Sequence, residues 1–165
     1  MELEEAKKHF IQSWGTLGSN WGVNRTMAQI HALLLVSNEP ISTEDMMEQL
    51  QISRGNANMN TRSLIEWGIV TKTYVPGERK EFFVTDKDIW ALARQVVKQR
   101  RQREIEPMLR VLKEVKRVEG KDKETKEFKE LIENIDNFTQ KADDLMDKFI
   151  RSDEHWFYRQ LLKMV

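Results

Sequence analysis

One short run of this chain carries side chains that can read the edges of nucleic-acid bases. Residues 53–62 read Ser-Arg-Gly-Asn-Ala-Asn-Met-Asn-Thr-Arg. Asparagine can bond bidentately to adenine and arginine to guanine, while the small and polar residues of the first half would not hold a helix away from a groove. Three asparagines and a glycine are poor helix formers, so helix propensity alone does not account for them. We therefore expect DNA contacts from Ser53, Arg54, Gly55, Asn56, Ala57, Asn58, Asn60, Thr61 and Arg62.

A second basic group follows at the tip of a predicted β-hairpin. Residues 69–75 and 80–85 alternate and are rich in β-branched and aromatic types, and Pro76-Gly77-Glu78-Arg79 connects them. Lys72, Arg79 and Lys80 would give this hairpin a basic tip that can lie along a minor groove or clamp phosphates. The alternative is protective charge on an exposed edge hairpin.

The elements before the hairpin would position the base-reading run. Ser42 and Asp45 are spaced as an approximate capping box, which begins a helix ending near residue 50. Ser53 caps the next helix, which runs to about Trp67, and Gly68 is a suitable stop. Helix, turn, helix and hairpin in this order are typical of a winged helix-turn-helix, an arrangement suited to entering a DNA groove.

The remaining segments are predicted to be helical. Pro107 would kink the longest helix or mark a junction between two helices. A stripe of apolar residues spaced near 3.5 in 123–150, from Phe128 to Phe149, indicates a packing seam between helices. The predicted helices are 3–17, 24–37 with Asn24 as its cap, 86–118, 123–150 and 153–164.

The sequence thus predicts a mostly α-helical protein with a small β-hairpin wing and a helical dimerisation extension. We expect an N-terminal dimerisation helix over 1–23, the winged helix-turn-helix DNA-binding domain over 24–90, and a C-terminal helical dimerisation region over 91–165.

Charge is distributed unevenly along the 165 residues, although the formal net charge is zero. Residues 1–52 carry 3 Lys/Arg against 7 Asp/Glu, a net −4. Residues 53–103 carry 11 against 5, a net +6, and residues 104–165 carry 13 against 15, a net −2. Local field decides where a polyanion docks, so the middle segment is the expected DNA-facing part.

Composition narrows the other possibilities. There is no cysteine, which excludes thiol chemistry and suits a cytoplasmic protein. The acidic start lacks the pattern of a secretory signal, and the longest apolar run, Ala32 to Val36, is too short to span a bilayer. His9, His31 and His155 form no metal-ligand pattern, and no nucleophile with a matching base is visible. We expect no enzyme activity, no metal and no cofactor.

Three stretches resemble a known family. RTMAQIHALLLVSNEPISTEDMMEQLQIS, SRGNANMNTRSLIEWGIVTKTYVPGERKEFF and VTDKDIW, within residues 24–90, are similar to MarR-type winged-helix regulators. Within that group they most resemble the GbsR-type branch, repressors linked to choline and glycine betaine genes. The resemblance implies a homodimer on a pseudo-palindromic operator, with the recognition helix at 53–66 and a wing arginine at Arg79. The family often has Asp-x-Arg at the wing, whereas this chain has Gly77-Glu78-Arg79-Lys80.

Five tryptophans could serve a ligand or a core. Trp14, Trp21 and Trp156 lie outside the predicted DNA-binding domain and are the candidates for an aromatic cage around a quaternary ammonium effector. Packing in the core or at a dimer interface is the competing interpretation. Two other functions remain open: a winged-helix protein-interaction module, and a non-specific nucleic-acid-binding structural protein.

Overall fold

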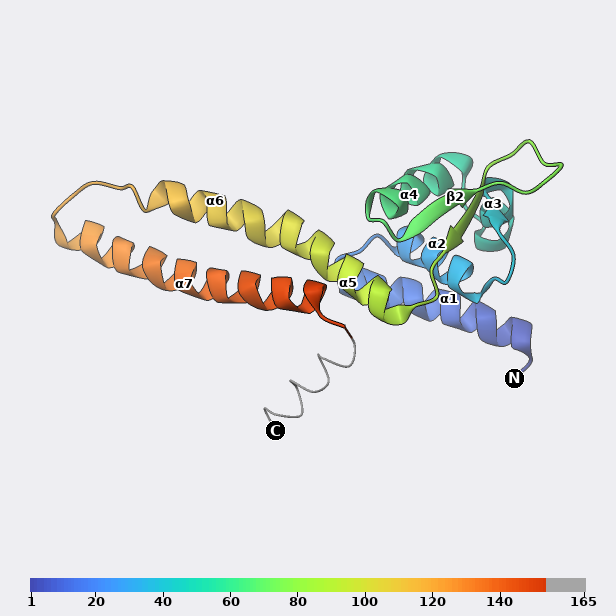
Figure 1. Ribbon diagram of the computed structural model, residues 1–165, viewed down its shortest axis with the longest axis horizontal. Coiled ribbons are helices and arrows are strands. Elements are labelled where there is room, and N and C mark those ends of the chain that lie inside the picture. Colours follow the sequence, from blue (N-terminus) through green and yellow to red (C-terminus); the bar gives the residue numbers. More distant parts are fainter. Residues whose placement is uncertain (154–165) are drawn as a thin grey trace. The chain divides into compact units, whose positions relative to one another are not determined.

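The computed structural model describes residues 1–153, and the chain divides into two compact units, Met1–Leu92 and Ala93–Val165 (Figure 1). The last helix predicted from the sequence, over 153–164, therefore lies outside the described residues almost entirely. The elements of the N-terminal unit, in chain order, are α1 (Leu3–Asn20), α2 (Arg25–Val36), β1 (Ile41–Ser42), α3 (Thr43–Leu50), α4 (Arg54–Glu66), β2 (Val70–Thr73), β3 (Phe82–Thr85) and the start of α5 (Ile89–Arg100).

The core of the N-terminal unit forms around α2. Apolar residues occur on nearly every side of this helix, so it is buried along most of its length, and α1, α3, α4 and β3 pack against it. Ile30 and Ala32 are completely buried. The approach of α1 is close at Gly18, where an added Cβ would lie 2.6 Å from the Cβ of Ala28.

Three helix starts are capped as the sequence predicts. The side chain of Asn24 accepts the Met27 N–H, and that of Ser53 accepts the Asn56 N–H. Ser42 and Asp45 form a complete capping box, in which each side chain accepts the other residue's backbone N–H. These bonds satisfy N–H groups that the first turn of a helix leaves without partners.

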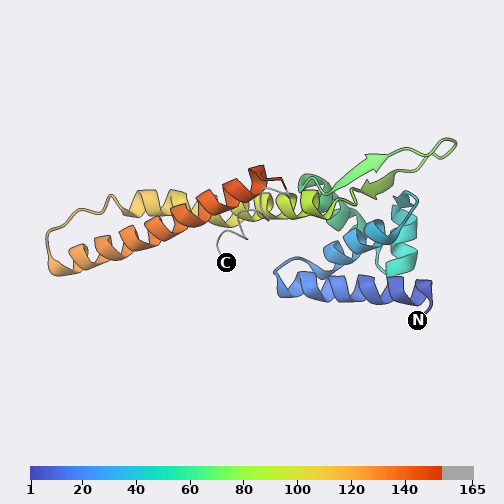
Figure 2. The ribbon, with the colours of Figure 1, turned by 60° about the horizontal axis from the view of Figure 1, so that its bottom comes forward.

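The predicted hairpin is present and gains a third strand. β2 and β3 pair antiparallel, with Lys72 opposite Phe83, and the order in the sheet is β1-β3-β2. β1 was not expected from the sequence; it is two residues long and pairs Ser42 with Phe82. The loop between β2 and β3 extends beyond the strands as a wing (Figure 2). Gly77, at φ 87°, makes its turn.

The C-terminal unit is built from long helices. α5 is followed by a π-helical turn, η1 (Arg101–Ile105), then by α6 (Glu106–Val115) and, after a loop, by α7 (Lys123–Arg151). The prediction that Pro107 marks a junction is confirmed, because it lies in the first turn of α6 directly after η1. Proline lacks an N–H and clashes with the carbonyl four residues earlier, so it is tolerated in the first turn of a helix, where Pro107 lies in α6.

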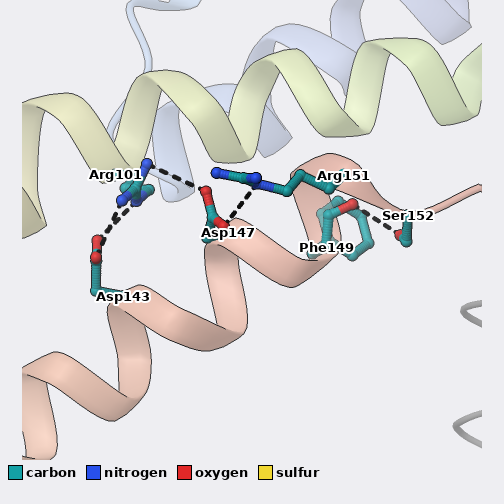
Figure 3. Close-up of polar contacts among 6 residues, drawn as sticks. All are labelled: Arg101, Asp143, Asp147, Phe149, Arg151 and Ser152. Carbon is teal, nitrogen blue, oxygen red and sulfur yellow. Dashed lines mark hydrogen bonds and ion pairs between the residues drawn. The ribbon is translucent and has the colours of Figure 1, made fainter.

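The face on which α7 packs against η1 and α6 is unusually polar. Arg101 donates from Nε and Nη2 to the two carboxylate oxygens of Asp143, at 2.7 and 3.0 Å. Its Nη1 lies 3.5 Å from Asp147, which also pairs with Arg151 at 2.7 Å (Figure 3). Further along, the buried Asp136 pairs with Lys116.

The apolar stripe of α7 does not pack on α6. The residues of α7 that are buried are Ile132, Asp136 and Thr139, whereas Phe138 is 75% exposed and Leu145 is 68% exposed. The spacing of apolar residues in the sequence predicted one continuous apolar stripe but not which element packs against it. The packing seam expected between helices is therefore not made with α6 by the exposed members of the stripe, which are Phe128, Leu131, Ile135, Phe138 and Leu145.

Candidate nucleic-acid interface

One face of α4 carries most of the exposed base-reading side chains. Positions 55, 58, 59 and 62 are exposed, and each of 58 and 59 lies three or four residues from both 55 and 62, which places all four along one stripe of the helix. Arg54 and Ser53 extend this stripe at the N-terminus of the helix, where free N–H groups attract phosphate. The stripe consists of Gly55, Asn58, Met59 and Arg62.

The structure buries three residues that the sequence assigned to this surface. Ala57, Asn60 and Thr61 are at most 3% exposed and face the core. The reason is the 3.6-residue period of a helix, which turns these positions toward α2 and α3. Thr61 donates its hydroxyl to the sulfur of Met46 at 3.4 Å. The exposed set is therefore narrower than the predicted one.

Two of the three asparagines are engaged inside the unit. Asn60 donates from Nδ2 to the backbone oxygen of Asn56 at 2.9 Å and to its Oδ1 at 2.6 Å. Asn56 donates in turn to the hydroxyl of Thr26 on α2 at 3.5 Å. The bond from Asn56 ties α4 to α2, and these contacts give two of the asparagines a structural role that the sequence did not reveal. Asn58 is exposed.

The start of α3 lies against the N-terminal half of α4. Arg54 donates from Nη2 to Oε1 of Glu44 at 2.7 Å, and Thr43 donates its hydroxyl to Oδ1 of Asn58 at 3.4 Å. Sequence reasoning did not single out Glu44, because ten residues and a turn separate it from its partner. It also omitted Met59, whose exposed apolar side chain is of the type that can contact a thymine methyl.

The wing presents its basic residues at the surface. Lys72 pairs with Glu81 across the hairpin at 2.7 Å, and Nζ of Lys80 lies 5.4 Å from the centre of the Phe82 ring. Arg79 is exposed in the loop. All three predicted wing residues are therefore exposed, and two of them have contacts within the hairpin that hold their positions.

Two of the three candidate effector residues, Trp14 and Trp21, lie among the described residues. Trp14 is half-buried, with its ring 5.3 Å from Phe10 and 6.3 Å from His31, whereas Trp21 is exposed. Trp156 lies outside the described residues. A separate hollow of about 430 Å³ between α1, α2 and the end of α3 is lined by other residues, including Ile11, Leu33 and Glu48.

Residues 1–153 contain neither a metal-binding cluster nor a membrane-spanning helix. No cluster of three or more His, Asp or Glu side chains there could hold a metal ion. No helix in the same range is long and apolar enough to cross a membrane.

Comparison with known proteins places this chain near transcription regulators. No family model matches it. It is 24% identical over 104 residues to the HTH-type transcriptional repressor GbsR of Bacillus subtilis (strain 168), a match covering 63% of this chain and 57% of that protein. The chain thus spans little more than half the length of this relative. A solved structure described as a transcriptional regulator superimposes on 87% of this chain and 99% of its own, with a TM-score of 0.55 and 21% identity.

The fold class is settled by these observations together. The protein is mostly helical with a small three-stranded antiparallel sheet, and its fold is a winged helix-turn-helix. In this fold α3 and α4 are the helix-turn-helix pair, and β2 and β3 form the wing.

Proposed function

We propose that this protein is a sequence-specific, DNA-binding transcription regulator of the MarR-like, GbsR-type branch, a repressor that acts as a homodimer in the cytoplasm. The observation that carries the proposal is the exposed stripe of α4, which combines arginine and asparagine at a capped helix N-terminus. The relative's name, a transcriptional repressor, supports the same function. Repression would be steric, since a dimer on a promoter blocks RNA polymerase.

The two basic groups would have different tasks. Arg54, Asn58 and Arg62 would contact base edges in a major groove, with Ser53 and Gly55 allowing close approach. Lys72, Arg79 and Lys80 would contact the flanking phosphates or minor groove. In a homodimer two such helices would enter successive major grooves about 34–36 Å apart on a pseudo-palindromic operator.

The exposed stripe of α7 supports the homodimer. Leu131, Phe138 and Leu145 recur every seven residues and are all exposed in one chain, a pattern typical of helices that pack on a partner helix. Burying each side chain contributes about 1.5–3 kcal/mol, and twofold symmetry doubles the number buried. Met108 and Val111 on α6 are also exposed and would extend this surface.

Sedimentation of single-residue variants tests the homodimer. Phe138→Glu places a charge within the stripe and should give a monomer. Asn137→Glu adds the same charge at the exposed neighbouring position and should leave the dimer intact. Circular dichroism would establish that both variants keep their helices. A monomeric parent protein, or a dimeric Phe138→Glu variant, would contradict the proposal.

The effector in this proposal is a quaternary ammonium compound such as choline. Tryptophan faces attract such cations, and the Phe10–Trp14 pair offers two neighbouring aromatic rings. The effector would bind the dimer and lower its affinity for the operator. Operator affinity would be measured with and without choline, and Trp14→Leu should abolish any response. No change on adding choline would remove the effector from the proposal.

Binding to promoter DNA from its own locus, against random DNA of equal length, tests the central function. Arg54→Ala should lose the preference for its own promoter, and Arg79→Ala should weaken binding to both DNAs. Lys141→Ala, which removes one positive charge from the exposed surface of α7, should change neither. Equal and weak binding to both DNAs would instead favour a winged-helix protein-interaction module. Tight binding without preference would favour a nucleic-acid-binding structural protein.

A further inference from the structure

Glu44 is an acidic residue beside the positive charges of Arg54 and Lys80. It is the second residue of α3, and its Oε1 lies 2.7 Å from Nη2 of Arg54, the first residue of the recognition helix. Both side chains are about half exposed. The neighbouring contact from Thr43 to Asn58 holds the start of α3 at the same edge of α4.

The surroundings of Glu44 are those of an anion site. It lies in the first turn of α3, where the helix dipole and free N–H groups favour negative charge. Its own backbone N–H, and then the guanidinium of Arg54, hold the pKa of Glu44 below its ordinary value, with a further contribution from the positive charge of Lys80. A helix N-terminus, an arginine and a lysine are together what a phosphate group would also bind.

The ion pair does little for the fold itself. Exposed pairs of this kind contribute little to stability because water and salt screen them. Its effect on recognition is larger. Arginine has five N–H donors, and Glu44 accepts one of them, so the guanidinium is held in place with donors left for a guanine edge. The same carboxylate repels any phosphate that approaches this edge, whatever the base sequence.

We propose that Glu44 is a positioning residue that sets DNA specificity, holding Arg54 toward a base edge and weakening binding to DNA of any other sequence. This inference rests on the proposed function, since it assigns a role within the same surface. It predicts that removing the charge of Glu44 strengthens non-specific binding while reducing discrimination.

The test compares Glu44→Gln with Glu48→Gln. Glu48 lies one turn further along α3 and is exposed, so its variant removes the same charge from the same helix away from Arg54. Dissociation constants for promoter and random DNA would be measured across a range of salt concentrations. Glu44→Gln should bind random DNA about fivefold or more tightly, lose about fivefold or more in the promoter-to-random ratio, and steepen the salt dependence by about one unit of slope.

A double variant tests whether Glu44 acts through Arg54. In an Arg54→Ala background, Glu44→Gln should leave the promoter-to-random ratio unchanged, because no guanidinium remains to be held. A full additional loss of the ratio in that background would overturn the positioning role. Melting temperatures should match the parent protein's, since an exposed ion pair contributes little to stability.

Failure of this inference is distinguishable from failure of the proposed function. If the parent protein prefers its promoter and Glu44→Gln keeps the same ratio, the role of Glu44 is overturned and the regulator stands. If Glu48→Gln changes the ratio as much as Glu44→Gln, general charge rather than position is responsible, and the inference fails. If the parent protein shows no preference for its promoter, the proposed function and the role of Glu44 are both wrong.

Discussion

The two units distribute apolar and polar residues in opposite ways. In the N-terminal unit the completely buried large side chains are mainly apolar, such as Ile30, Met46 and Val70. In the C-terminal unit the buried residues include Asp136 and Thr139, while large apolar side chains of α7 lie at the surface. The first unit completes its own core. The second pairs polar groups between its helices and leaves large apolar side chains of α7 exposed.

Deleting a core side chain should have the largest effect on stability, and the same change on α7 should show how the two units differ. Ile30→Ala removes a fully buried side chain, and we expect a loss of about 2–5 kcal/mol in the free energy of unfolding. Leu145→Ala, which truncates an exposed side chain of α7, is the control. Chemical denaturation at several protein concentrations would measure both. Leu145→Ala should change only how the unfolding midpoint depends on protein concentration, as expected if Leu145 lies at the proposed dimer contact.

Removing the buried polar contacts between α7 and the end of α6 should have the next largest effect on stability. Asp136 accepts from Lys116 and, at 2.7 Å, from Gln140. Asp136→Ala leaves both donors without this acceptor and should cost about 1–3 kcal/mol in unfolding free energy. The double variant Lys116→Met with Asp136→Leu should recover most of that loss, since an apolar pair can replace a buried ion pair. No recovery would mean that the packing of α7 against the end of α6 requires polar residues at these positions.

Acid should destabilise the N-terminal unit through His31. Burial lowers the pKa of this histidine from 6.5 to about 4, and its Nε2 has no hydrogen-bond partner in the described part of the chain. The unfolded chain therefore binds a proton more readily, so stability is complete above about pH 6.5 and falls between there and about pH 4.

The expected loss is about 2 kcal/mol of unfolding free energy by pH 5. His31→Leu should remove this part of the pH dependence while remaining folded at pH 7.5. Denaturation midpoints measured from pH 7.5 to 5 would show it. A variant with the parent protein's full pH dependence would assign the effect to other groups.

Removing Arg101, which bonds to both carboxylate oxygens of Asp143 (Figure 3), should have a smaller effect on stability. Here the folded state favours the charged form of the titrating group, whereas at His31 it favours the neutral form. The guanidinium of Arg101 holds the pKa of Asp143 below its ordinary value, against the opposing effect of burial. Arg101→Ala should cost about 1 kcal/mol near neutral pH. Arg101→Lys should recover only part of this, because lysine cannot bond bidentately to Asp143.

The sign of the pH dependence checks this assignment. Asp143 with a depressed folded-state pKa stabilises the protein above its unfolded pKa, and this stability is lost as pH falls through the folded pKa. The difference between the parent protein and Arg101→Ala should therefore shrink in acid. A difference that stays constant down to low pH would show that packing of the Arg101 side chain, rather than charge, is responsible.

Local signals in the sequence predicted much of the fold. Asn24, Ser42 and Ser53 each precede a helix, and Gly68, at φ 69°, follows one, because caps and stops depend on a few adjacent residues. The hairpin was visible for the same reason. β1 was not, since two residues acquire strand pairing only when β3 is beside them.

The candidate site was predictable in type but not in orientation. A list of polar residues in one helix does not say which of them face inward, so Asn60 and Thr61 looked available although they are buried. Glu44 was missed because its pairing with Arg54 depends on the angle between two helices. The apolar stripe of α7 was found, but periodicity alone cannot tell a neighbour within the chain from one in another molecule.

The π-helical turn at residues 101–105 makes the helix before it and the helix after it differ in phase by one residue. One residue of an α-helix corresponds to about 100° of rotation and 1.5 Å of rise. Deleting one codon within 101–105 would therefore let an ordinary α-helix replace the π turn and leave the faces of α6 nearly where they are relative to residues 93–100. Pro107 would then lie inside a continuous α-helix and meet a carbonyl four residues earlier. The proline, and not the orientation of the two helices, would oppose such a deletion.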